Sequence, residues 1–189
     1  SSLQIAPKLL TKSGFAFNYP DLNQALSSEF KDAGVFDSFF FRDQFVSLKP
    51  EEIFQFFSRA ENLETLTPPW LNFKIVAKSA EEIHKGSIID YKLKIHGLPV
   101  RWKTHIVDWK KNEFFIDEQK KGPYAKWYHV HTFESVPGGC LLRDEVIYRV
   151  PVGIVGNVFL GAWIARDVNE IFNYRQEKIE AIFKIGKHD

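Results

Sequence analysis

Residues 89–102 read IDYKLKIHGLPVRW, and this stretch gives the clearest structural signal in the chain. Its first half alternates polar residues with four apolar ones, namely Ile89, Tyr91, Leu93 and Ile95. A period of two is typical of a β-strand with one buried face. The sequence Gly97-Leu98-Pro99 then marks a turn. Because this turn is too short to hold a crossover helix, the following strand must run antiparallel to the first.

Similar runs, separated by equally short turns, occur on both sides of this stretch. Together they predict seven strands, within residues 39–48, 73–77, 89–95, 100–109, 114–119, 127–136 and 141–150. Two short helices are expected between the first and second strands, one opening at Pro50-Glu51-Glu52 and one over residues 61–66. Helical spacing returns only near the end of the chain, where it predicts one long amphipathic helix over residues 162–182.

These elements predict an α+β fold in which a curved, seven-stranded antiparallel sheet wraps a long C-terminal helix. One helix cannot cover a sheet of this breadth, so we expect an internal cavity. Residues 1–37 are interpreted as an N-terminal extension with a short helix, residues 38–185 as the main domain and residues 186–189 as a tail. Gly153, Gly156 and Gly161 lack the spacing of a phosphate-binding loop, and we expect them to bend the chain before the long helix.

The charge balance and the cysteine content narrow the function classes. The chain has 189 residues, of which 25 are Lys or Arg and 24 are Asp or Glu, and the net charge of +1 argues against a nucleic-acid partner. The single cysteine, Cys140, excludes an intramolecular disulfide and indicates a reducing, cytoplasmic compartment. Because the sequence starts at Ser1 and contains no Met, removal of an N-terminal targeting segment stays open.

The longest uncharged stretch, residues 150–165, is shorter than the ~20 apolar residues that a spanning helix needs. Transient contact with a membrane stays open, and nothing in the sequence indicates the oligomeric state.

Several short motifs carry a resemblance to a known superfamily. They are Leu66-Thr67-Pro68-Pro69-Trp70, Gly97-Leu98-Pro99-Val100-Arg101-Trp102, Asp117-Glu118-Gln119 with Gly122-Pro123-Tyr124, the alternating Trp127, His129, His131 and Phe133, Asp144 with Tyr148, and Tyr174-Arg175. In these motifs, over about residues 38–185, the chain resembles the START/birch-pollen-allergen superfamily (SRPBCC, polyketide cyclase/dehydrase-like). The resemblance is strongest to a bacterial subgroup related to domains that precede epimerase-like modules. It implies a helix-grip fold, on which lipid carriers, receptors, cyclases and hydrolases all occur.

Trp127, His129, His131 and Phe133 lie on one face of a predicted strand, because side chains repeat every second residue. The two aromatic residues indicate that this face points inward and brings both histidines toward the cavity. Three interpretations remain open: hydrogen-bonded core histidines, polar anchors for a ligand, or groups that transfer protons near neutral pH.

Phe114, Ile116 and Glu118 share a face of the preceding strand, and we expect this face to point inward as well. Glu118 is then a third catalytic candidate beside His129 and His131, with Arg101 as the partner of its buried carboxylate. Asp144 lies on the apolar side of the last strand, so it also needs a partner.

A metal site would need further ligands beside the two histidines, with Glu118 or His105 as candidates. The spacing matches no established zinc motif, so we expect no metal and no cofactor. The expected ligand-binding set is completed by Tyr91, Leu93, Trp102, Tyr148, Phe159 and Trp163.

Three functions follow from these patterns and from the resemblance. The first is binding of a small hydrophobic molecule, such as a lipid, an isoprenoid quinone or a polyketide. The second is a cyclase/dehydrase-like enzyme, a lyase or isomerase, acting on such a molecule. The third is a non-catalytic protein-interaction module that uses residues 1–37 or 150–165. We favour binding over catalysis.

Overall fold

The computed structural model describes residues 34, 36–151 and 153–183, and over residues 153–160 it describes the backbone only. The short helix predicted within residues 1–37 and the tail 186–189 lie outside this part of the chain. None of the described helices combines the length and the apolar character that crossing a bilayer requires.

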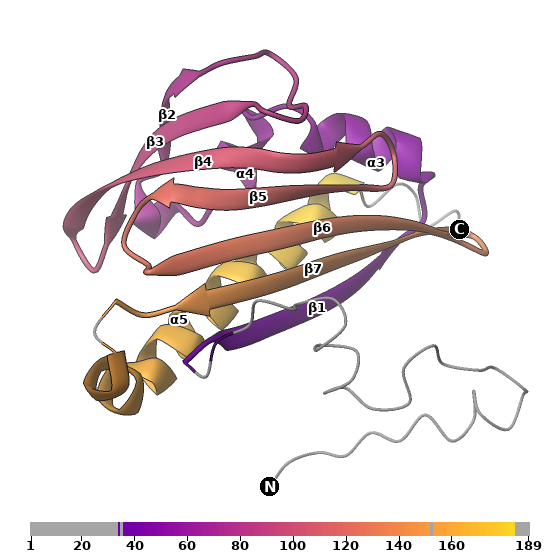
Figure 1. Cartoon of the computed structure of the whole chain (residues 1–189). Coiled ribbons are helices and arrows are strands. Elements are labelled where there is room, and N and C mark those ends of the chain that lie inside the picture. Colours follow the sequence, from indigo (N-terminus) through magenta and orange to yellow (C-terminus); the bar gives the residue numbers. More distant parts are fainter. Residues whose placement is uncertain (1–33, 35, 152, 184–189) are drawn as a thin grey trace, which may run out of the picture. The chain divides into compact units, whose positions relative to one another are not determined.

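Seven strands form one antiparallel sheet, as predicted (Figure 1). Along the sheet the strands follow the order β1-β7-β6-β5-β4-β3-β2, so that β2 to β7 form a meander and β1 pairs with β7. Their bounds are β1 Ser38–Val46, β2 Lys74–Lys78, β3 Ile88–Ile95, β4 Leu98–Lys110, β5 Phe114–Lys121, β6 Lys126–Val136 and β7 Gly139–Arg149.

The two predicted short helices are α3 (Pro50–Phe57) and α4 (Asn62–Leu66), and a 3-10 turn, η1 (Pro69–Leu71), follows them. At the start of α3 the Glu52 carboxylate accepts a hydrogen bond from the backbone N–H of Lys49 at 3.1 Å. This contact satisfies a backbone donor that the helix itself leaves unpaired. Pro50 in the first turn needs no such partner because it has no N–H.

The long helix, α5, spans Gly153–Phe183 and therefore begins well before the predicted residue 162. The expectation that Gly153, Gly156 and Gly161 bend the chain ahead of the helix is wrong, because all three lie within α5. Glycine costs a helix only about 1 kcal/mol per residue relative to alanine. A penalty of this size does not end a helix whose later turns are held by tertiary packing.

Buried side chains form two clusters on the helix-bearing face of the sheet. The larger cluster includes Ile53, Phe54, Ile106, Phe133 and Ile179, so it joins α3, the sheet and the last turns of α5. The smaller cluster contains Phe40, Val146, Tyr148, Val168 and Phe172, and it holds α5 against β1 and β7. Figure 1 shows α5 running along this face, with α3 and α4 farther along it.

Candidate functional site

The sheet and α5 enclose a cavity of about 530 Å³, which the breadth of the sheet predicted. Its walls come from α4, η1, strands β3 to β6 and α5, and members of both buried clusters take part in them. Most of the lining is apolar or aromatic. A volume in this range is typical of sites for small organic molecules.

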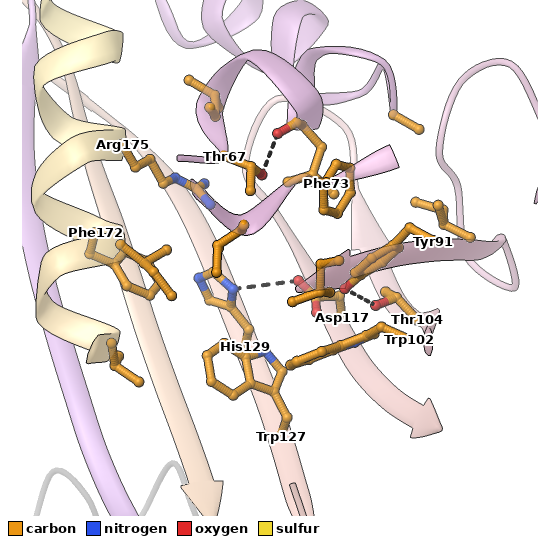
Figure 2. Close-up of a pocket in the computed structure, with 18 of the residues that line it drawn as sticks. Thr67, Phe73, Tyr91, Trp102, Thr104, Asp117, Trp127, His129, Phe172 and Arg175 are labelled. Carbon is orange, nitrogen blue, oxygen red and sulfur yellow. Dashed lines mark hydrogen bonds and ion pairs between the residues drawn. The ribbon is translucent and has the colours of Figure 1, made fainter. Parts of the chain in front are cut away.

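One wall of the cavity carries a buried group of charged and polar side chains (Figure 2). His129 and His131 project from β6, with their ring centroids 3.6 Å apart. Asp117 is paired with His129 across β5 and β6, and Asp144 is paired with His131 across β6 and β7. Arg175 completes the group from α5. We call these five residues the polar cluster.

Each carboxylate of the polar cluster bridges both histidines. Asp144 Oδ1 lies 2.9 Å from His129 Nε2 and 2.9 Å from His131 Nδ1. Asp117 Oδ2 lies 2.9 Å from His131 Nε2 and 3.5 Å from His129 Nδ1. The two imidazole rings are therefore held between two carboxylates, one on each neighbouring strand.

Burial and countercharge act in opposite directions on the carboxylates. Burial raises the pKa of Asp144, but the nearby charge of Arg175 and the hydrogen bonds from His129 and His131 outweigh it and leave that pKa well below the usual value. Burial likewise raises the pKa of Asp117, but the hydrogen bond from His131 and the surrounding positive charge bring it below normal. Both carboxylates are therefore ionised at neutral pH.

The two histidines differ in their environment and in their hydrogen bonds. Burial and the neighbouring His131 lower the pKa of His129 to about 4, so its ring is neutral at neutral pH. His131 Nε2 donates a hydrogen bond to Asp117 Oδ2 at 2.9 Å, and His131 Nδ1 accepts one from Arg175 Nη2 at 3.2 Å. The polar cluster therefore holds an unprotonated His129 ring nitrogen, Nδ1, beside a hydrogen-bonded His131 ring.

Six of the residues predicted to bind a ligand line the cavity: Tyr91, Leu93, Trp102, Trp127, His129 and His131. The alternation on β6 was therefore assigned to the correct face. Phe133, on the same face, is buried in the larger cluster rather than in the lining. Tyr148 is buried in the smaller cluster, and the side chain of Phe159 lies outside the described part of the structure.

The assignment of β5 is wrong by one residue. Phe115 and Asp117 face the cavity, whereas Phe114, Ile116 and Glu118 do not. Phe114 and Ile116 are half-buried on the outer face, so both faces of β5 carry apolar side chains and the period of two does not identify the inner one.

The predicted pair of Arg101 and Glu118 does not form either. Arg101 is exposed, and Glu118 accepts a hydrogen bond from Lys120 at 2.7 Å on the outer face.

Asp117 and Arg175 belong to the site but were not predicted from the sequence. Asp117 is the residue next to the predicted Glu118. In the structure it pairs with His129 across β5 and β6, and this register places it on the inner face. Arg175 occurs in a motif of the resemblance but received no role, because helical spacing alone does not say which strand its side chain reaches. The expectation that Asp144 needs a partner is confirmed by its contacts with both histidines and Arg175.

Two cavity-lining residues carry buried donors without a hydrogen-bond partner in the described structure. They are Trp102 Nε1 and Arg175 Nε. A buried donor that stays unpaired costs about 1–3 kcal/mol, so both favour a ligand with acceptor oxygens.

A contact between the β3–β4 turn and α5 joins two elements that line the cavity. His96 Nε2 lies 2.6 Å from Asp167 Oδ2, and the His96 ring stacks on Trp163 with centroids 4.1 Å apart. His96 and Asp167 both line the cavity. Trp163, predicted as a ligand contact, is 40% exposed and lies outside the lining, where it supports His96.

The polar cluster also contains a set of atoms suited to a metal ion. Asp117, His129 and His131 each offer one ligand atom, and these atoms lie within 4.8 Å of one another. The carboxylate that completes this set is Asp117, not Glu118 or His105 as the sequence suggested.

Residues 46–175 match the model of a protein family described as polyketide cyclase / dehydrase and lipid transport. This range covers more than half of the chain. The comparison with curated protein sequences found no match.

Three solved structures illustrate the similarity of fold. A START superfamily protein from Mycobacterium smegmatis is 14% identical with a TM-score of 0.59, over 77% of this chain and 97% of that one. The protein TTHA0849 from Thermus thermophilus is 16% identical with a TM-score of 0.56, over 77% of this chain and 99% of that one. The di-domain ARO/CYC protein StfQ from the steffimycin biosynthetic pathway is 11% identical with a TM-score of 0.64, over 84% of this chain and 53% of that one.

Proposed function

This chain belongs to the polyketide cyclase / dehydrase and lipid transport family, and on that premise we propose that its cavity binds one small apolar molecule that carries acceptor oxygens. Isoprenoid quinones, polyketides and oxygenated lipids fit this description. The observation that carries the proposal is a largely apolar cavity of about 530 Å³ whose polar groups are concentrated on one wall.

The size of the cavity is adequate for useful affinity. Burying about ten methylene-sized groups contributes ~8 kcal/mol before the costs of association. Apolar contact alone therefore gives micromolar or weaker binding. Hydrogen bonds from Trp102 Nε1 and Arg175 Nε to ligand oxygens would add to it, because both donors otherwise stay unpaired among the described residues.

Native mass spectrometry of the purified chain, followed by organic extraction, tests this proposal. We expect an excess mass that is released as an apolar compound, or binding of a quinone, polyketide or fatty acid from a panel. The cavity-filling variant L93W should lose the ligand, because Leu93 lines the cavity. The control V76W adds the same ring at a residue that is 55% exposed and outside the lining, and it should retain the ligand.

The proposal fails if the folded chain carries no ligand and binds no member of the panel with a Kd below about 1 mM. It also fails if L93W, with an unchanged circular dichroism spectrum, binds as tightly as V76W.

A cyclase/dehydrase-like reaction is the second candidate, and the polar cluster favours it. The His129 ring lies in the cavity wall with Nδ1 3.5 Å from Asp117, and its lowered pKa keeps this nitrogen unprotonated, so it could accept a proton as a weak base. A lyase or isomerase of this kind needs no group beyond those that accept and return a proton. The variant H129Q should then bind substrate but not convert it, and product formation at the wild-type rate in H129Q contradicts this role.

A further inference from the structure

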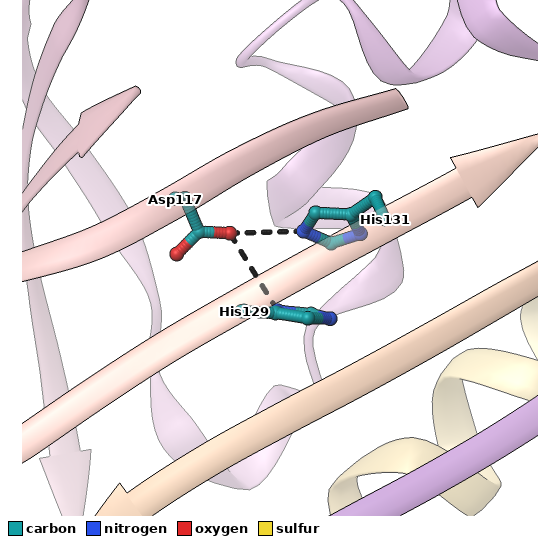
Figure 3. Close-up of side chains that lie close together, drawn as sticks. All are labelled: Asp117, His129 and His131. Atoms are coloured by element: carbon teal, nitrogen blue, oxygen red, sulfur yellow. Dashed lines mark hydrogen bonds and ion pairs between the residues drawn. The ribbon is translucent and has the colours of Figure 1, made fainter. Parts of the chain in front are cut away.

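Three atoms that could bind a metal ion lie close together in the cavity wall (Figure 3). Asp117 Oδ2 lies 2.9 Å from His131 Nε2 and 3.5 Å from His129 Nδ1. Asp117 faces His129 across the β5–β6 ladder, and His131 is two residues farther along β6. All three side chains therefore project from the same face of two adjacent strands, which are rigid elements of the fold.

The opposite ring nitrogens of both histidines are already engaged. His129 Nε2 donates to Asp144 Oδ1 at 2.9 Å, whereas His131 Nδ1 lies 2.9 Å from the same oxygen and accepts a hydrogen bond from Arg175 Nη2 at 3.2 Å. In neutral rings these contacts point the lone pair of His129 Nδ1 toward Asp117 and place the His131 proton on Nε2, in its hydrogen bond to Asp117 Oδ2. A metal ion bound among the three atoms would replace this hydrogen bond and release its proton.

A carboxylate behind a histidine ring is also the usual arrangement around a bound metal ion. Such a carboxylate orients the ring and makes the ligating nitrogen a better donor of its lone pair. Here Asp144 Oδ1 lies 2.9 Å from a nitrogen of each ring, and Arg175 Nη2 holds it in place at 3.2 Å. His129 thus has the orienting carboxylate that metal-bound histidines usually have.

We propose that Asp117, His129 and His131 bind one divalent first-row transition-metal ion. With ligand bonds of about 2.0–2.2 Å, neighbouring ligand atoms lie roughly 3–3.5 Å apart, and the two distances from Asp117 Oδ2 agree with this spacing. Two imidazoles and one carboxylate suit Zn²⁺, Fe²⁺ and their neighbours rather than Mg²⁺ or Ca²⁺, which prefer oxygen ligands alone.

The proposed ion faces the cavity. Asp117, His129 and His131 all line it, whereas Asp144 does not. Three protein ligands leave at least one coordination position open, which is the arrangement of reactive rather than purely structural sites. An oxygen atom of a bound molecule can occupy that position. The inference concerns the ion alone and does not depend on the apolar ligand proposed above.

Titration of the whole chain, purified without a histidine tag and treated with a chelator, tests the inference. Isothermal titration with Zn²⁺ and with Co²⁺ should give one ion per chain, and bound Co²⁺ should show the visible absorption of a low-coordinate site with nitrogen ligands. D117N removes one ligand charge while keeping the shape of the side chain, and D144N removes the shared orienting carboxylate. We expect each to weaken binding by about 10–100-fold.

E118Q is the matched control, because Glu118 is the next carboxylate on the same strand and faces outward to Lys120. It should bind both ions as tightly as the unmodified chain. Folding of every variant is checked by circular dichroism, and H129Q replaces D117N if D117N does not fold.

Absence of stoichiometric Zn²⁺ and Co²⁺ binding to the unmodified chain overturns the inference, whatever the variants do. The inference is also overturned if folded D117N and folded H129Q bind Zn²⁺ and Co²⁺ as tightly as the unmodified chain does, because the ion then lies elsewhere. Apolar-ligand binding is measured separately on chelator-treated chain, so failure of the metal site and failure of the proposed function give different results.

Discussion

Arg175 Nη2 lies 3.2 Å from Asp144 Oδ1, so a buried ion pair joins the long helix α5 to strand β7. The guanidinium carbon of Arg175 also lies 5.1 Å from the ring centroid of Phe57 and 5.7 Å from that of Phe172. The charge is therefore enclosed by aromatic rings, and Asp144 is its only carboxylate partner within ion-pair distance in the described structure. This contact fixes one side of the polar cluster and one wall of the cavity.

Removal of the Asp144 carboxylate should be strongly destabilising. The variant D144N leaves Arg175 buried without its countercharge, and breaking a buried pair in this way typically costs about 3–5 kcal/mol. We expect the free energy of unfolding, measured by urea titration, to fall by that amount. The control is D43N, which breaks the exposed pair of Asp43 and Arg143 and should cost less than about 1 kcal/mol. Equal losses in both variants contradict the role of the buried pair.

Trp102 should recognise oxygen atoms of a ligand through its indole N–H. In W102F the ring is kept in part but the donor is lost, so binding of a naphthoquinone should weaken by about 2–10-fold while binding of the matching naphthalene changes little. Fluorescence titration measures both. W109F is the control, because Trp109 lies on the same strand and its Nε1 also lacks a partner among the described residues, but it is outside the cavity lining. A uniform loss for both compounds in W102F indicates packing instead.

The contact of His96 with Asp167 should slow exchange of the ligand. It bridges the β3–β4 turn and α5 at residues that line the cavity, and both side chains are partly exposed. In H96A we expect the association and dissociation rate constants to rise together by up to about fivefold, with little change in Kd, because a partly exposed pair contributes about 0.2–1 kcal/mol. Stopped-flow fluorescence with an apolar probe measures these rates. H84A, at an exposed residue outside the cavity lining, should leave them unchanged.

Cys140 should make stability depend on pH in the alkaline range. Burial, together with the charges of Glu51 and Glu134, raises the pKa of its thiol from 9.0 to about 11. The unfolded chain ionises first as the pH rises, so the stabilising effect of the buried thiol is complete below about pH 9 and is lost as the pH approaches 11. Urea titrations should therefore show the wild type losing stability relative to C140A across this window. A constant difference contradicts the raised pKa.

The sequence was sufficient for the architecture because the patterns that specify it are local. The alternation from Ile89 to Ile95 and the turn at Gly97 identify antiparallel neighbours, and the helical spacing after residue 162 identifies the one long helix. Because one helix is too narrow to cover a sheet of seven strands, these elements then predict an internal cavity. The inward face of β6 was also readable, because Trp127 and Phe133 flank the two histidines on one side only.

The inward face of β5 depended on tertiary structure. Phe114 and Ile116 cover the outer face nearly as well as Phe115 covers the inner one, so burial on both sides removed the alternation that would have identified Asp117. The bulge on β4 between Ile106 and Asp108 shifts the register beside it, which no count along the sequence anticipates.

By itself, therefore, the sequence determined a seven-stranded sheet around one helix and the placement of His129 and His131 toward its interior, since backbone periodicity acts within single strands. Only the tertiary structure decided that Asp117, Asp144 and Arg175 meet these histidines. They come from three separate elements, and strand register and helix packing bring their charged atoms within 3.5 Å of the rings or of one another. Contacts of this kind depend on distances across the fold, which the order of residues does not contain.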